Sequence, residues 1–579
     1  MKKLLITSLF LGSCVLLLAQ KTTKIPNVYK PVRSEMYKKG WIDFNKNGVK
    51  DTYEDPTAPI DARIEDLLSQ MTLEEKTCQM VTLYGYKRVL KDDLPTSEWK
   101  NQLWKDGIGA IDEHLNGFQQ WGLPPSDNEY VWPASKHAWA LNEVQRFFIE
   151  ETRLGIPTDF TNEGIRGVES YKATNFPTQL GLGHTWNRQL IHQVGLITGR
   201  EARMLGYTNV YAPILDVGRD QRWGRYEEVY GESPYLVAEL GIEMVRGMQH
   251  NHQVAATGKH FIAYSNNKGA REGMARVDPQ MSPREVEMLH AYPFKRVIRE
   301  AGLLGVMSSY NDYDGEPITG SYHFLTEILR QEWGFKGYVV SDSEAVEFIS
   351  SKHKVANTYE DGIAQAVNAG LNIRTHFTPP ADFILPLRKA VDNGKISQET
   401  LDKRVAEILR IKFRLGLFDN PYRGNGKQAE QIVHSKEHQA VSLEAARQSL
   451  VLLKNETNLL PLSKSIRSIA VIGPNANEQT QLICRYGPAN APIKTVYQGI
   501  KELLPHTEVI YKKGCDIIDP HFPESEILDF PKTAEEVQLM EEAIRAAKQA
   551  EVVVMVLGGN ELTVREDRSR TSLNLPGRQ

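Results

Sequence analysis

The sequence predicts an α/β fold in which a (β/α)8-like TIM barrel is followed by a flavodoxin-like α/β sandwich domain. First, the 579 residues exceed what a single hydrophobic core organises, so at least two domains are expected. Second, short apolar strands alternate with amphipathic helices from residue 61 to residue 425, which is typical of a parallel barrel. Third, the turn-rich stretch Gly416–Gly426 interrupts this alternation before it resumes.

Three segments show the strand pattern of the barrel clearly. Asn209–Ile214, Gly305–Tyr310 and Gly337–Asp342 are short and apolar, and each follows a helical pattern. The carboxyl ends of parallel barrel strands meet at one face, which carries the reactive groups of such barrels. Polar residues at these ends are therefore candidates for a functional site: Asp216, Lys259, His260, Tyr310 and Asp342.

The second domain is expected at residues 446–579, after a barrel domain at 61–425 and a linker at 426–445. Its expected buried strands are Leu450–Leu453, Ile469–Pro474 and Glu551–Gly559, which are apolar and bounded by helical patterns.

The N-terminus has the pattern of a secretory signal peptide at residues 1–19, followed by an extension at 20–60. Two lysines precede the apolar run Leu4–Ala19, which is too short to span a bilayer comfortably. We therefore expect export across an inner membrane into the periplasm. Leu11–Cys14 resembles a lipoprotein cleavage site, but the apolar run continues past it, so a soluble and a lipid-anchored form both stay open.

Residues 43–54 fit the twelve-residue calcium-loop pattern D-x-[DN]-x-[DN]-G-x5-E. A hard cation is suited by oxygen ligands at this spacing with a glycine at the sixth position. The candidate ligands are Asp43, Asn45, Asn47, Val49 through its carbonyl, Asp51 and Glu54. Pro56 and Pro59 exclude the usual exit helix, so the alternative is a turn-rich linker without metal.

Composition excludes some classes of function. The 69 basic and 73 acidic residues nearly balance and form no block of like charge, so a nucleic-acid partner is not expected. Beyond the signal peptide, only Cys78, Cys484 and Cys515 occur, without metal-ligand spacing. Cys484 and Cys515 could pair, although buried thiols are the favoured interpretation.

Two features point to sugar chemistry. Cleaving a glycosidic bond requires two carboxyl groups, and Asp342 lies at a strand end between two serines. An alternative role for Asp342 is to cap the helix that follows. The segment Arg222–Glu228 combines a tryptophan with two arginines, which suits sugar faces and hydroxyls, and Lys259-His260 adds two further donors.

These residues lie in blocks that resemble, in the same order, the signature blocks of glycoside hydrolase family 3. The blocks are Met71–Lys76, Asp216–Val217, Arg222–Tyr235, Lys259–Phe261, Met307–Asn311, Gly334–Asp342 and Gly416–Tyr422. The resemblance runs from about residue 60 to the C-terminus. It implies a retaining exo-β-glycosidase that removes terminal β-D-glucosyl residues from oligosaccharides and needs no cofactor for catalysis.

The resemblance also implies roles for individual residues. Asp342 matches the nucleophile, and Glu566 matches the acid/base because it precedes a Leu-Pro-Gly sequence at residue 575; Glu561 is its rival. Ser569 stands where the family has an aspartate. The residues that match sugar contacts are Glu163, Arg225, Lys259, His260, Arg276 and Tyr310.

Three alternatives and one departure accompany this interpretation. A β-xylosidase of the same family is the first alternative, because the distinction depends on loop shape, although a glucosidase is preferred. An N-acetylglucosaminidase is disfavoured, because residues 259–267 lack the His-Asp loop of that branch.

Relatives continue past the Leu-Pro-Gly point, so the second domain is expected to be incomplete, with an apolar patch at Val552–Val556. A non-catalytic sugar-binding protein is then the third alternative, and the sequence indicates no oligomeric state.

Overall fold

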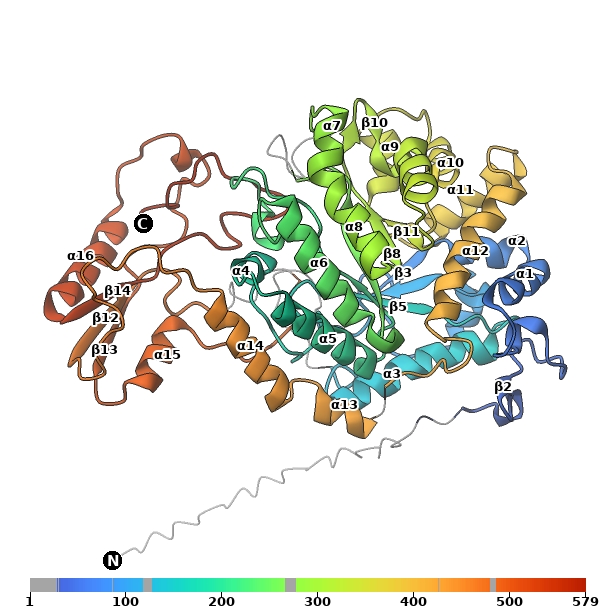
Figure 1. The fold of residues 1–579 in the computed structure, drawn as a ribbon, viewed down its shortest axis with the longest axis horizontal. Coiled ribbons are helices and arrows are strands. Elements are labelled where there is room, and N and C mark those ends of the chain that lie inside the picture. The colour runs from blue at the N-terminus through green and yellow to red at the C-terminus, as the bar shows by residue number, and fades with distance from the viewer. Residues whose placement is uncertain are drawn as a thin grey trace, which may run out of the picture.

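The computed structural model describes residues 29, 31–85, 87–117, 128–265, 278–424, 426–479 and 486–579. The predicted signal peptide, Arg276 and Cys484 lie outside these residues. A large barrel and a smaller α/β domain lie side by side, and two helices along one edge connect them (Figure 1). In the described part of the chain, no helix is both long enough and apolar enough to cross a membrane.

Seven parallel strands form the barrel sheet in the order β11-β8-β7-β6-β5-β4-β3. The strands are β3 (Thr82–Tyr84), β4 (Ala110–Asp112), β5 (Asp159–Glu163), β6 (Asn209–Tyr211), β7 (Ala255–Phe261), β8 (Gly305–Ser308) and β11 (Tyr338–Ser341). Ile373 bridges to Val340 of β11, and Arg374 bridges to Val81 beside β3, both in parallel. These two residues take the eighth position, so the sheet closes on itself without a free edge.

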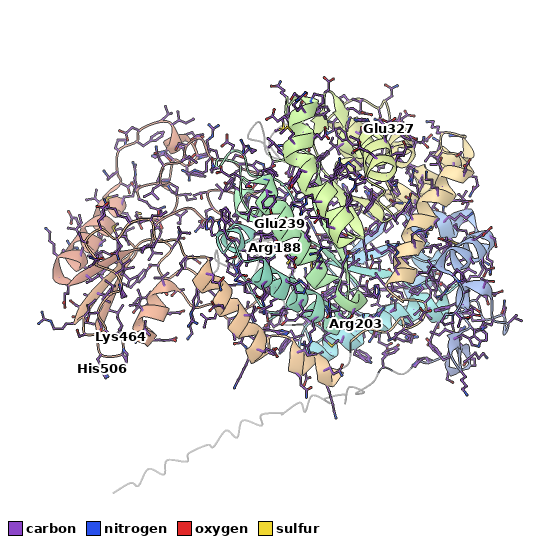
Figure 2. All side chains as sticks on the ribbon, viewed as in Figure 1. Arg188, Arg203, Glu239, Glu327, Lys464 and His506 are labelled. Carbon is purple, nitrogen blue, oxygen red and sulfur yellow. The ribbon has the colours of Figure 1, made fainter. Side chains whose placement is uncertain are left out.

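Amphipathic helices surround the sheet and bury one apolar face each against it. They include α1 (Ile60–Gln70), α2 (Leu73–Gln79), α3 (Ala134–Arg146), α5 (Arg188–Leu205), α6 (Pro234–Met248), α8 (Tyr292–Ala301), α9 (Ala345–Ser351), α10 (Tyr359–Ala369), α11 (Ala381–Asp392) and α12 (Gln398–Arg414). Their outer faces are charged: Arg188 of α5 pairs with Glu239 of α6 at 2.9 Å (Figure 2).

Local sequence signals set the helix ends. Asn187 caps α5 by accepting a hydrogen bond from the backbone N–H of Leu190, and α5 ends at Gly206 with a φ of 110°. Ser233 caps α6 in the same way, and Pro234 occupies its first turn, where no backbone donor is needed. These boundaries place the β5–β6 and β6–β7 connections, which carry site residues at the same end of the barrel.

The second domain contains a three-stranded parallel sheet in the order β13-β12-β14. Its elements are β12 (Ser468–Ile472), α15 (Val496–Leu503), β13 (Glu508–Lys512), α16 (Ala534–Gln549) and β14 (Val552–Met555). The segment expected as a linker forms α13 (Gly426–Ile432) and most of α14 (Lys436–Gln448), which contact barrel helices α3 and α5. Cys78 and Cys515 are buried free thiols.

One expected strand was wrong. Leu450–Leu453 forms no strand, and these residues are exposed, with Leu450 81% and Leu453 91% accessible. The apolar run has no strand neighbour among the described residues, so composition alone misled the prediction. On edge strand β14, Val553 and Met555 are exposed, whereas Val552 and Val554 pack against the core of the second domain, so only part of the expected patch at Val552–Val556 is exposed.

Candidate active site

A cavity of about 170 Å³ opens at the carboxyl ends of the barrel strands, and both domains line it. The lining residues are Tyr84, Arg88, Asp112, Glu113, Glu163, Tyr211, Met307, Tyr310, Asp342, Ser343, Thr375, Phe377, Tyr486 and Glu566. Tyr486 and Glu566 come from the second domain, whereas the others come from the barrel. Glu561 and the residues of the 43–54 loop do not line this cavity.

Asp342 follows β11 directly and faces the cavity. Its backbone N–H donates to the carbonyl of Ser308 at 3.0 Å, which continues the pairing of β11 with β8. Its Oδ1 accepts a hydrogen bond from the backbone N–H of Ser343 at 2.8 Å. The N-cap of helix α9 is Glu344, so capping does not account for Asp342.

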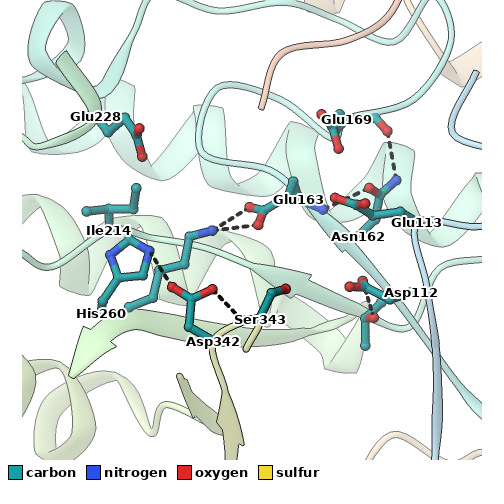
Figure 3. A network of polar contacts seen from close by, with 12 residues as sticks. Asp112, Glu113, Asn162, Glu163, Glu169, Ile214, Glu228, His260, Asp342 and Ser343 are labelled. Carbon is teal, nitrogen blue, oxygen red and sulfur yellow. Dashed lines mark hydrogen bonds and ion pairs between the residues drawn. The ribbon is translucent and has the colours of Figure 1, made fainter. Parts of the chain in front are cut away.

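Lys259 of β7 and Glu163 of β5, the strands on either side of β6, form a buried ion pair. Lys259 Nζ donates to both oxygens of Glu163, at 2.6 and 2.7 Å (Figure 3). Burial raises the pKa of Glu163 to about 7, against the opposing charge of Lys259. A carboxylate fixed in this way presents an acceptor edge toward the cavity, which suits the hydroxyl groups of a sugar.

His260 lies between two aspartates. Its Nδ1 is 2.7 Å from Asp216 Oδ2, and its backbone N–H donates to the same oxygen at 3.1 Å. Its Nε2 is 3.7 Å from Asp342 Oδ2 (Figure 3). Burial, followed by the charges of Arg225 and Lys259, lowers the pKa of His260 well below its usual range. The ring is therefore neutral near pH 7, and Asp216 fixes its orientation.

Arg225 links the two domains electrostatically. It is 1% exposed and makes a two-point contact with Glu228, at 2.9 Å from Nε and 2.6 Å from Nη2. Its remaining nitrogen, Nη1, donates to Glu566 Oε1 at 3.3 Å. One guanidinium thus contacts a barrel carboxylate and the carboxylate supplied by the second domain.

Backbone contacts hold the segment that carries Glu566 against the barrel. The N–H of Gly224 donates to Ser569 Oγ at 3.1 Å, and the N–H of Arg570 donates to the carbonyl of Arg222 at 2.8 Å. A Cβ at position 224 would lie 2.1 Å from the carbonyl oxygens of Arg565 and Arg568. Only glycine therefore allows the two backbones to approach this closely.

The groups around Asp342 shift its pKa in opposite directions. Burial raises its pKa, and the negative charge of Glu566 raises it further. Arg225, Lys259 and a hydrogen bond from Tyr310 act in the opposite direction. These opposing effects allow one of the two carboxyl groups, Asp342 and Glu566, to be ionised while the other is protonated. A nucleophile and a general acid require these different protonation states.

The structure brings together most of the residues that the sequence singled out, and it adds others. Asp112, Glu113, Tyr486 and Phe377 line the cavity but were not predicted. Asp112 ends an apolar strand, a signal that was available in the sequence. Burial, followed by the neighbouring Asp112 charge, raises the pKa of Glu113 well above its usual range. No feature of the sequence identifies Tyr486 as a cavity residue, because its position depends on how the second domain docks against the barrel.

Family models match both parts of the chain. The model described as the glycosyl hydrolase family 3 N terminal domain matches residues 72–411, and the model for the C-terminal domain of the same family matches residues 450–579. The chain therefore belongs to glycoside hydrolase family 3.

Relatives carry two kinds of name. A beta-xylosidase of Formosa agariphila is 34% identical over 454 residues, covering 74% of this chain and 60% of the relative. A periplasmic beta-glucosidase of Salmonella typhimurium is 32% identical over 542 residues, covering 90% of this chain and 65% of the relative. The chain thus spans less than two thirds of the length of these relatives.

A solved structure shares the fold. The β-glucosidase EmGH1 of Erythrobacter marinus superposes with a TM-score of 0.79 at 29% identity, covering 91% of this chain and 69% of that protein.

The glycine contact generates a prediction about the interface between the domains. Gly224→Ala should displace the 565–570 segment, because the added Cβ meets two carbonyl oxygens at 2.1 Å. We expect faster hydrogen exchange at the Arg570 amide, measured by mass spectrometry, with barrel helices unaffected. Gly499→Ala on α15 is the matched control, since a Cβ there meets nothing within 4 Å. Unchanged exchange at Arg570 in Gly224→Ala would contradict this role.

Proposed function

We propose that this chain is a retaining exo-β-glycosidase that hydrolyses terminal β-D-glucosyl residues of oligosaccharides. The observation that carries the proposal is the pair Asp342 and Glu566, two carboxyl groups from different domains that line one cavity with Lys259, His260 and Arg225 close by. Hydrolysis of a glycosidic bond with retention needs two such groups on either side of the bond. A cavity of about 170 Å³ suits one terminal sugar rather than the middle of a polysaccharide.

In the proposed first step, a carboxylate oxygen of Asp342 forms a bond to the anomeric carbon while the bond to the leaving oxygen breaks. Glu566 gives its proton to that departing oxygen. The anionic form of Asp342 is favoured by Arg225, Lys259 and Tyr310. The product is a covalent glycosyl-enzyme intermediate and a free alcohol.

In the second step, Glu566 takes a proton from water, whose oxygen attacks the anomeric carbon and releases Asp342. Two inversions retain the configuration of the sugar. The Glu163–Lys259 pair and His260 would bind sugar hydroxyls, because their donors and acceptors lie beside Asp342 at the strand ends. Tyr310 and Tyr486 add ring surfaces to the cavity.

The choice between a glucoside and a xyloside depends on whether the cavity admits a hydroxymethyl group. Relatives with both names support a β-glycosidase in general, so β-xylosidase is the alternative. Comparing kcat/KM for the nitrophenyl β-D-glucoside and β-D-xyloside decides between them. If the protein binds these glycosides but hydrolyses neither, the remaining alternative is a non-catalytic sugar-binding protein.

We further propose that the protein acts in the periplasm. The apolar run at residues 4–19 and a relative named as a periplasmic beta-glucosidase support this location. Fractionation of cells that produce the natural protein tests it, because retention in the cytoplasm would exclude it.

Asp342→Ala tests the nucleophile. We expect kcat on the nitrophenyl glycoside to fall by about 10⁴-fold or more with the fold retained, because the first bond to the anomeric carbon cannot form. Azide should restore activity and give a glycosyl azide of inverted configuration, identified by NMR. Hydrolysis by Asp342→Ala at the rate of the unsubstituted protein would rule out the assignment.

Glu566→Ala tests the acid/base. Loss of a general acid hurts poor leaving groups most, so disaccharide hydrolysis should fall by about 10²- to 10⁴-fold. The first step on dinitrophenyl glycosides should be spared, because dinitrophenolate departs without protonation. Glu561→Ala is the matched control and should show no dependence on the leaving group. The reverse pattern in the two variants would assign the role to Glu561.

The charge of Glu566 should also appear in the pH profile. A dinitrophenyl glycoside needs no general acid, so with this substrate only Asp342 must be in a fixed protonation state, the ionised one. Burial raises the pKa of Asp342 and an ionised Glu566 raises it further, so activity is lost as pH falls through that raised pKa. Glu566→Gln removes the charge and should move the acid limb of kcat/KM for a dinitrophenyl glycoside to lower pH, by about half a unit or more. Glu561→Gln should leave the limb in place, and an equal shift in both variants would refute the coupling.

A further inference from the structure

The loop at residues 43–54 has a buried carboxylate oxygen without a partner. Asp43 is 5% exposed, and its Oδ1 has no hydrogen-bond partner. Its Oδ2 accepts a hydrogen bond from the backbone N–H of Gly48 at 3.0 Å, at the glycine in the middle of the loop. Oδ2 thus fixes the carboxylate on the loop backbone, and the buried Oδ1 stays uncompensated. A buried carboxylate oxygen is unfavourable unless a donor or a cation compensates it.

Three further polar side chains of the loop are joined by hydrogen bonds. The side-chain amides of Asn45 and Asn47 both donate to Asp51 Oδ2, at 2.6 and 2.8 Å. Their amide oxygens accept backbone N–H groups of the loop, Asn45 Oδ1 from Asn47 at 3.1 Å and Asn47 Oδ1 from Val49 at 2.7 Å. An amide oxygen has two lone pairs, so each can also ligate a cation. A cation between these side chains and Asp43 would therefore receive oxygen ligands from all four.

The negative charge of this loop is not neutralised by its own lysines. Lys46 Nζ donates to the carbonyl of Ile149 at 2.9 Å, and Lys50 pairs with Asp55 at 2.9 Å. Of the ion pairs that the structure describes, none involves Asp43 or Asp51. Two carboxylates with amide and carbonyl oxygens form a hard-oxygen set, which suits calcium.

Glu54 does not have the ligand role that its position in the pattern predicts. Its Oε1 accepts hydrogen bonds from the N–H groups of Phe44 and Asn45 at 2.6 and 3.3 Å, and its Oε2 accepts one from Asp51 at 3.1 Å. Both oxygens are thus used to fold the loop. Accordingly, the described residues contain no group of three or more His, Cys, Asp or Glu side chains arranged for a metal.

We propose that this loop binds one calcium ion through side-chain oxygens of four residues and one backbone carbonyl. Glu54 is not a ligand and holds the loop in shape through its hydrogen bonds to backbone N–H groups. The ligands are Asp43, Asn45, Asn47, Asp51 and the carbonyl of Val49. Water completes the roughly six to eight oxygens that calcium takes. With only two carboxylates, the site belongs with extracellular modules, whose dissociation constants are about 10⁻⁴ to 10⁻³ M.

The bound ion would fasten the N-terminal segment to the barrel. Phe44 packs edge-on against Phe418 at 5.4 Å between ring centroids, and Lys46 donates to the carbonyl of Ile149 in the middle of the η5 helix (Phe147–Glu151). The loop thus contacts residues that follow α3 and α12, and none of its residues lines the cavity, so we expect its effect on stability rather than on the reaction.

Calorimetric titration of metal-free protein with calcium chloride tests the proposal. We expect one site at about 10⁻⁴ to 10⁻³ M, and a rise of roughly 1 to 3 °C in melting temperature at about 10 mM calcium. Asp43→Asn should weaken binding at least tenfold and abolish the rise. Asp55→Asn is the control, because it also removes one negative charge next to the loop without removing a ligand.

If Asp43→Asn fails to fold, Asn47→Ala replaces it, since Asn47 is exposed and its loss leaves the packing intact. Three results would overturn the proposal. They are the absence of both heat and a melting shift, calcium binding that is unchanged in Asp43→Asn and Asn47→Ala, and a magnesium-induced shift as large as that of calcium.

Discussion

The close approach of two backbones at Gly224 is the contact on which the site depends. The second domain supplies Glu566, and its segment reaches the cavity only because position 224 has no side chain. The same approach places Arg225 between Glu228 and Glu566. Because the site is assembled from two domains, the contacts at the domain interface must position Glu566 as accurately as the barrel strands position Asp342.

Burial and charge are balanced within the cavity. Acidic groups crowd the strand ends, and burial raises the pKa of Glu163, Asp216 and Asp112 to about 7 each. Lys259 and Arg225 supply the opposing charge, and each contacts a carboxylate directly. Such a cluster costs stability in an empty protein and is retained at sites that bind polar ligands.

The sequence predicted the barrel and most of its reactive face, because polar residues at strand ends are a local signal. Asp342, Lys259 and His260 could be found in this way. Glu566 could be proposed only from the family resemblance, because nothing near residue 566 in the sequence says that the segment touches Gly224. The expected strand Leu450–Leu453 failed for the same reason: strand pairing is a non-local property that an apolar run does not encode.

The helices α13 and α14 have a kinetic consequence. They pack on barrel helices, and residues 449–467, which form no helix or strand, join α14 to β12, so the second domain is tethered to the barrel (Figure 1). A tether makes the meeting of Glu566 and Asp342 intramolecular and gives the carboxyl group a high effective concentration at the cavity. The observed rate of hydrolysis is then proportional to the fraction of molecules in which the second domain is docked. Solvent conditions that weaken the interface would therefore lower this rate without altering any group in the barrel.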